Sequence, residues 1–224
     1  MIWSKEPDLP GPKKLIGGNM NAGFFGEVTT SDFITGDELA RLIGLTAGTS
    51  QYSNEPWLKF AYMGNIEFIA KKPFRNSISW NNLNAANLVF GNLAINIGGH
   101  TYKIRLPKGK TEGKQDDSSV YIGTICHNSE WNNLMLPIHE NAPNNWEMPQ
   151  NVESPTENWG VNYSNNDLLT NSEKNRCWTW CQEFGNDKTT HLLRGGYDVS
   201  FSHSNYSYLD YDDYGWRPVL EFVK

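Results

Sequence analysis

The chain has 224 residues, enough for one large or two small domains whose core needs no disulfide bonds. Its formal net charge is −6, and its 19 Lys and Arg residues are thinly spread, which argues against a protein that binds a nucleic-acid backbone. No apolar run approaches 18 residues and no signal-peptide core opens the chain, so we expect no membrane insertion. High Asn (26), Gly (20), Trp (9) and Tyr (10) contents are typical of a loop-rich β protein.

Residues 1–30 predict an extended N-terminal arm, because three prolines and five glycines interrupt any helix there. The arm nevertheless carries more large apolar side chains than a solvated tail needs. We expect five of them to anchor it: Trp3, Leu15, Ile16, Phe24 and Phe25. Two alternatives remain open, in which the arm packs on its own domain or docks on a partner subunit.

Residues 31–110 predict a small α+β module. Thr35 and Glu38 form a capping-box pattern, Ser79 is a second helix cap, and Gly98-Gly99 is typical of a hairpin turn. The predicted elements are a helix over 37–43, a hairpin of 57–62 and 66–70, a helix over 80–88, and a hairpin of 93–97 and 101–106.

Residues 107–119 are polar and predict a linker, at which we place a soft domain boundary. A strand over 120–125 and a helix capped by Ser129 follow. Residues 141–166 predict long irregular structure that Trp146 and Trp159 hold in place.

The three cysteines, Cys126, Cys177 and Cys181, are too few for a disulfide framework, so reduced and buried thiols are expected. Cys177 and Cys181 lack the two-residue spacing of a thioredoxin-type pair, and no second Cys/His pair completes a zinc site. We therefore expect no cofactor and no metal.

Recurring landmarks fill the C-terminal region: Ser129-Glu130-Trp131-Asn132, Trp159-Gly160-Val161-Asn162-Tyr163, Trp178-Thr179-Trp180-Cys181-Gln182-Glu183, Arg194-Gly195-Gly196 and Gly215-Trp216-Arg217-Pro218-Val219. The last two resemble the ending of the C-type-lectin-like fold found in formylglycine-generating-enzyme relatives and phage receptor-binding proteins. The first three, together with the last, look like the recurring landmarks of phage virion and tail proteins. Upstream, Gly23-Phe24-Phe25-Gly26-Glu27-Val28, Leu45-Thr46-Ala47-Gly48-Thr49 and Trp57-Leu58-Lys59-Phe60 also look like those phage proteins. The resemblance implies a rigid β scaffold that displays a variable loop surface, usually in a virion.

The resulting expectation is a β-rich α+β chain with an anchoring arm (1–30), a small module (31–110) and a C-type-lectin-like domain (120–224). No catalytic residue is carried over from the formylglycine-generating enzymes, because Cys177 and Cys181 do not fit their active-site pattern.

The candidate binding residues are the tyrosines and aspartates near the C-terminus, because stiff amphipathic rings and neighbouring carboxylates suit a sugar or a protein surface. They are Tyr206, Tyr208, Tyr211, Asp210, Asp212 and Asp213. Tyr197, Tyr214 and Trp216 are instead expected in the core. The three aspartates also suit calcium by chemistry, but their spacing matches no known calcium loop, and a solvated acidic turn is the favoured alternative.

Arg217 is expected to serve the structure rather than a ligand. An internal carboxylate, Glu183 or Glu221, would pair with its guanidinium, and an indole would lie against it.

The resemblance implies a non-enzymatic phage virion protein that is assembled in the bacterial host cytoplasm, and the tail is the expected location. The arm would contact other virion proteins, and the lectin-like face would bind a host glycan or protein. A homotrimer would raise the avidity of such a weak site. The leading alternative is a capsid decoration or head-fibre protein. A carbohydrate-active enzyme is the third, with Glu130 and Glu183 as a candidate carboxylate pair.

Overall fold

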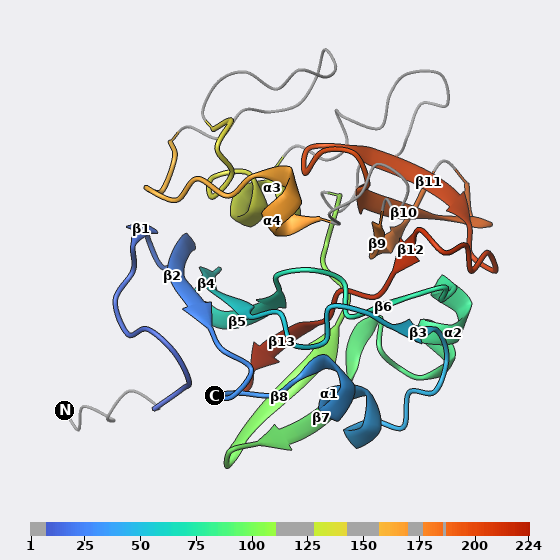
Figure 1. Cartoon of the computed structure of the whole chain (residues 1–224), viewed down its shortest axis with the longest axis horizontal. Coiled ribbons are helices and arrows are strands. Elements are labelled where there is room, and N and C mark those ends of the chain that lie inside the picture. Colours follow the sequence, from blue (N-terminus) through green and yellow to red (C-terminus); the bar gives the residue numbers. More distant parts are fainter. Residues whose placement is uncertain (1–7, 111–127, 143–156, 170–176, 186) are drawn as a thin grey trace.

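The chain is built on two main β-sheets, seen in the computed structural model in Figure 1, which describes residues 8–110, 128–142, 157–169, 177–185 and 187–224. The larger sheet has seven strands in the order β1-β2-β4-β5-β13-β8-β7. Its strands are β1 (Gly17–Gly18), β2 (Ala22–Val28), β4 (Trp57–Tyr62), β5 (Asn65–Ala70), β7 (Phe90–Ile97), β8 (His100–Arg105) and β13 (Val219–Phe222). All of its pairings are antiparallel.

The second sheet has four strands in the order β11-β10-β9-β12, at the upper right of Figure 1. Its strands are β9 (Trp178–Phe184), β10 (Thr190–Gly195), β11 (Ser202–Tyr206) and β12 (Tyr214–Gly215). A two-stranded ribbon pairs β3 (Thr49–Ser50) with β6 (Arg75–Asn76). The described residues contain four short helices, so the fold is a β-rich α+β fold: α1 (Gly36–Leu42), α2 (Trp80–Ala85), α3 (Glu130–Met135) and α4 (Asn165–Leu168).

The local predictions for the first half of the chain are confirmed. Thr35 and Glu38 form the capping box of α1, and Ser79 forms one with Asn82 at α2. Both predicted hairpins are present, as β4–β5 and β7–β8. Helix α2 ends at Ala85 rather than 88, because Asn87 takes a positive φ of 59° and closes the turn.

The N-terminal arm is part of the large sheet from Gly17 onward, through β1 and β2. Strand β2 pairs with β4 along its length, Phe24 is fully buried, and Phe25 is 8% exposed. These two side chains therefore pack within the chain itself and are not available to a partner. Leu15 is half-buried and Ile16 is exposed, so anchoring through them stays a prediction, while Trp3 lies outside the described residues.

The last strand of the chain joins the two predicted regions. Strand β13 pairs with β5 on one side and with β8 on the other, and thereby fills the centre of the large sheet. Helix α3 begins at its Ser129 cap as predicted. The predicted linker beyond residue 110, the strand over 120–125, and Trp146 lie outside the described residues.

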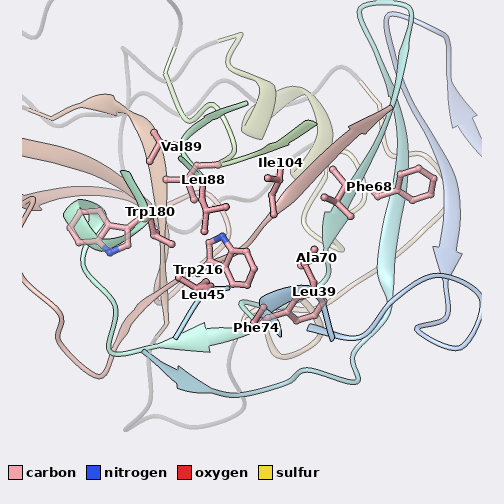
Figure 2. Close-up of a cluster of buried hydrophobic side chains, with 14 of the residues drawn as sticks. Leu39, Leu45, Phe68, Ala70, Phe74, Leu88, Val89, Ile104, Trp180 and Trp216 are labelled. Atoms are coloured by element: carbon pink, nitrogen blue, oxygen red, sulfur yellow. The ribbon is translucent and has the colours of Figure 1, made fainter. Parts of the chain in front are cut away.

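A hydrophobic core connects the two sheets. Figure 2 shows Trp216 between Trp180 of the small sheet and Phe68 of the large sheet, and all three side chains are fully buried. A second cluster covers the opposite face of the large sheet, where Trp131 of α3 packs with Phe60 and Val219. The strands β4, β5 and β13 are therefore buried on both faces, which holds the C-terminal region rigidly on the N-terminal one.

Candidate functional site

The tyrosine-rich turn, residues 206–213, runs from the last residue of β11 to the start of β12 and is fixed to the rest of the protein through Ser207. The Ser207 backbone N–H donates to Thr189 O at 3.1 Å, and its carbonyl accepts from the Asn81 N–H of α2 at 3.0 Å. Its hydroxyl lies 2.6 Å from Nδ1 of the buried His191, whose ring stacks on Trp80. The residues on either side of Ser207 are thus presented from a rigid base.

The structure places the three predicted tyrosines at the surface, with exposed fractions of 48% for Tyr206, 65% for Tyr208 and 53% for Tyr211. The rings of Tyr206 and Tyr208 are nearly parallel, with an interplanar angle of 19° and centroids 5.6 Å apart. Tyr211 instead packs against the buried Tyr214 ring at 5.3 Å. Tyr206 and Tyr208 therefore form a paired aromatic surface, and Tyr211 flanks the base of the turn.

The three aspartates are not gathered into one ligand set. Asp210 and Asp212 are exposed, whereas Asp213 is half-buried and its carbonyl accepts from the Trp178 N–H at 2.6 Å. Among the described residues, no group of three or more His, Cys, Asp or Glu side chains is placed to hold a metal ion. The calcium alternative for this turn therefore gains no support.

Tyr197 is half exposed, so its predicted place in the core is wrong, whereas Tyr214 and Trp216 are buried as expected. The reason lies in the preceding glycines. Gly195 and Gly196 have positive φ values of 84° and 89°, and a Cβ on Gly196 would lie 2.4 Å from the Trp178 ring. This turn over Trp178 leaves Tyr197 outside, where its ring packs edge-on against Trp178 at 6.2 Å.

Three distant sequence landmarks meet at Trp131. The guanidinium groups of Arg194 and Arg217 lie 5.6 Å and 5.2 Å from the centre of its ring. Arg194 also donates to Asn132 Oδ1 at 2.6 Å, and the Trp131 indole N–H donates to Val199 O at 2.7 Å. These landmark residues are buried structural contacts rather than ligand-binding groups.

The predicted carboxylate partner of Arg217 is wrong. Its guanidinium donates to the carbonyls of Lys71 and Leu168, and no carboxylate pairs with it in the described part of the chain. The indole contact is confirmed, with Trp131 as the ring. Burial without a counter-ion lowers the pKa of Arg217 to about 10.

A buried ionic cluster around Arg105 was missed by the sequence analysis. Arg105 Nη2 lies 2.6 Å from Glu67 and 2.8 Å from Glu130, and its Nε donates to Glu221 at 3.0 Å. Glu67 and Glu130 are 2% exposed, and Glu221 is half-buried. One guanidinium therefore faces three carboxylates and joins β5, β8, β13 and α3.

Two carboxyl groups, Glu67 within this cluster and Glu183 outside it, have raised pKa values. Desolvation, followed by repulsion from the Glu130 carboxylate, raises the pKa of Glu67 to about 8 despite the opposing pull of Arg105. Desolvation also raises the pKa of Glu183 to about 7, against a hydrogen bond from the Gly109 N–H. Glu130 is buried and held by Arg105, so a sugar chain has no access to it, and the pairing of Glu130 with Glu183 for glycoside hydrolysis gains no support.

These shifts predict how stability depends on pH. The folded state keeps protons on Glu67 and Glu183 that the unfolded chain releases near pH 4.5. These two groups therefore stabilise the folded state at low pH, and this stabilisation is lost as pH rises through about 7 for Glu183 and about 8 for Glu67. Buried His191, with its pKa lowered to about 4, contributes above pH 6.5 and loses this contribution as pH falls. Between pH 6.5 and 8 the carboxyl groups dominate, and we expect the free energy of unfolding to fall.

Urea denaturation at intervals from pH 6.5 to 8 measures this fall, which is limited to about 1.4 kcal/mol per pH unit for each group. Glu67→Gln keeps a neutral side chain and is expected to flatten the slope. Glu140→Gln, at an exposed position, is the matched control and leaves the slope unchanged. Stability that rises with pH over this window would contradict the prediction.

The described cysteines, Cys177 and Cys181, are buried, as expected. Gln51 Nε2 donates to Cys177 Sγ at 3.2 Å, and burial raises the pKa of the Cys177 thiol to about 12. Such a thiol carries no thiolate at neutral pH and is a poor nucleophile or redox group. Cys126 lies outside the described residues.

Comparison with known proteins adds no family to this picture. No protein-family model, no curated protein and no solved structure matches the chain. Within the residues that the structure describes, none of the helices is long and apolar enough to cross a membrane.

Proposed function

We propose that this protein is a non-enzymatic component of a phage particle, tail-associated, whose tyrosine-rich turn binds a glycan or protein on the host surface. The observation that carries the binding role is the half-exposed, nearly parallel pair of Tyr206 and Tyr208 rings on a fixed turn. The virion role and a C-type-lectin-like arrangement of residues 120–224 are supported by the resemblance of the sequence landmarks. Contact with other virion proteins through Leu15 and Ile16 belongs to the same proposal.

The chemistry of the turn suits a carbohydrate. The apolar face of a pyranose ring stacks on an aromatic ring, and its hydroxyl groups donate to carboxylates such as those of the exposed Asp210 and Asp212. Because Ser207 already fixes the turn to Thr189 and Asn81, binding orders few additional backbone groups.

Removing the two paired rings is expected to weaken binding without unfolding the protein. Tyr206→Ala combined with Tyr208→Ala should lower affinity for a bacterial surface glycan, read on a glycan array, by about tenfold or more. The melting temperature should stay within about 2 °C, because both rings are half exposed or more. Tyr197→Ala, which removes a ring of similar exposure at another turn, is the matched control and should bind normally.

A large drop in melting temperature would show that the two rings serve the core, and unchanged binding would remove the turn from the site.

Gold-labelled antibody against residues 128–142 on intact particles tests the position in the virion. Label over the capsid would favour the decoration protein, and release of reducing sugar from host polysaccharide would favour an enzyme.

A further inference from the structure

Strand β7 forms one edge of the seven-stranded sheet and has eight residues, Phe90–Ile97. It pairs with β8 on one side, and among the described residues no backbone hydrogen bond from outside the sheet reaches it. A bulge interrupts the pairing between Phe90 and Leu93 and leaves residues 93–97 as a regular edge. The other edge of this sheet, β1, has only two residues.

The edge lacks the charges that usually protect such strands. No Lys, Arg, Asp or Glu occurs between Arg75 and Lys103, and β7 contains no proline. Natural proteins place charges, proline or a cover on a long edge strand, because its free N–H and C=O groups pair with other chains. Within the described residues, only the bulge at the start of β7 offers such protection, so residues 93–97 are open to pairing with another chain.

The backbone geometry shows which groups are free. The two-residue turn Gly98-Gly99 has φ values of 58° and 83°, as in a type I′ hairpin, and Ile97 faces His100 across it. The alternation of an antiparallel ladder then directs the N–H and C=O groups of Leu93, Ile95 and Ile97 toward β8. Those of Ala94 and Asn96 point to the open side.

The strand sequence is self-complementary around Ala94. Asn92-Leu93-Ala94-Ile95-Asn96 reads as the same residue classes in both directions. We propose that two copies of this chain pair antiparallel through β7, about a two-fold axis at Ala94. Leu93 of each copy then lies opposite Ile95 of the other, and Ala94 lies opposite Ala94.

This arrangement buries surface that one copy leaves open. Leu93, Ile95 and Ile97 pack against the core but are only half-buried. The two-fold axis places these side chains on the same face of the joined sheet as the corresponding side chains of the other copy. Phe90 is 52% exposed and comes to lie near Gly98 of the other copy. Asn96, whose Oδ1 accepts from the Gly99 N–H at 3.2 Å, comes to lie opposite Asn92 of the other copy.

Ala94→Glu tests the pairing in the full chain. The new carboxylate lies opposite Lys103 of its own hairpin, which supports folding of each copy, while two such carboxylates repel across the axis. Sedimentation equilibrium should give twice the chain mass for the wild type and a dimer association constant reduced about tenfold or more for A94E. Thr101→Glu, exposed on β8 and away from the edge, is the matched control and should stay dimeric.

A cysteine tests the register independently. Residues directly opposite in a hydrogen-bonded antiparallel pair have Cα atoms about 5.5 Å apart, within disulfide range. Ala94→Cys should therefore form a covalent dimer on diamide oxidation, whereas Thr101→Cys and the wild type should not. A monomeric or trimeric wild type, a dimer that A94E leaves intact, or a dimer that A94C fails to cross-link would overturn the proposal.

Discussion

Replacing Arg105 by methionine is expected to lower the free energy of unfolding by about 3–5 kcal/mol at pH 8, because it leaves buried carboxylates without their cation. Arg105 and Glu67 are both buried, and Glu130 also receives the Lys108 N–H at 3.2 Å. Methionine fills most of the space but donates no hydrogen bond. Repulsion among Glu67, Glu130 and Glu221 then acts in a poorly solvated site.

Denaturation in urea at two pH values separates this electrostatic effect from lost packing. At pH 5 the carboxyl groups with raised pKa values are protonated in both proteins, so the difference between Arg105→Met and the wild type should shrink. Adding Glu67→Gln to Arg105→Met should restore part of the stability at pH 8. Lys103→Met, an exposed position on the same strand, should change stability by less than about 0.5 kcal/mol. An equal loss at both pH values would show that packing, not charge, sets the cost.

The parts of the fold that local chemistry determines could be predicted from the sequence. The cap at Thr35 needs only Glu38 three residues later, and the β7–β8 turn needs only two glycines. The place of β13 between β5 and β8 could not be predicted, because it pairs residues such as Glu221 and Glu67 that lie far apart in the chain. No local pattern encodes which strand a C-terminal segment joins.

The candidate site was predicted in part for the same reason. Exposure of Tyr206, Tyr208 and Tyr211 followed from their place in a polar, Asp-rich turn. The Arg105 cluster could not be predicted, because Arg105 lies in a strand of alternating apolar and polar residues, where a charged residue is expected to face solvent. Its burial depends on α3, whose Glu130 covers that face of the sheet.

The binding turn depends on this distant packing. Glu130 binds α3 to Arg105, and the next residue, Trp131, packs against the guanidinium groups of Arg194 and Arg217. Arg194 lies in β10, and the same strand carries His191, which contacts Ser207. A chain of buried contacts thus runs from the large sheet to the base of the tyrosine-rich turn. Loss of one link is expected to reduce stability before it changes the exposed rings themselves.

Trp131→Ala is the second change with a large expected effect, a loss of about 3–5 kcal/mol in the free energy of unfolding. The indole is 1% exposed, and its removal leaves a cavity, frees the Val199 carbonyl and takes the ring from both guanidinium groups. Trp131→Phe keeps a ring beneath Arg194 and Arg217 and loses only the N–H bond and part of the volume, so its loss should be about half or less. Chemical denaturation of both variants, with the exposed Tyr197→Phe as control, measures the difference. Equal losses for alanine and phenylalanine would mean that the indole N–H, rather than the ring between the arginines, holds this junction together.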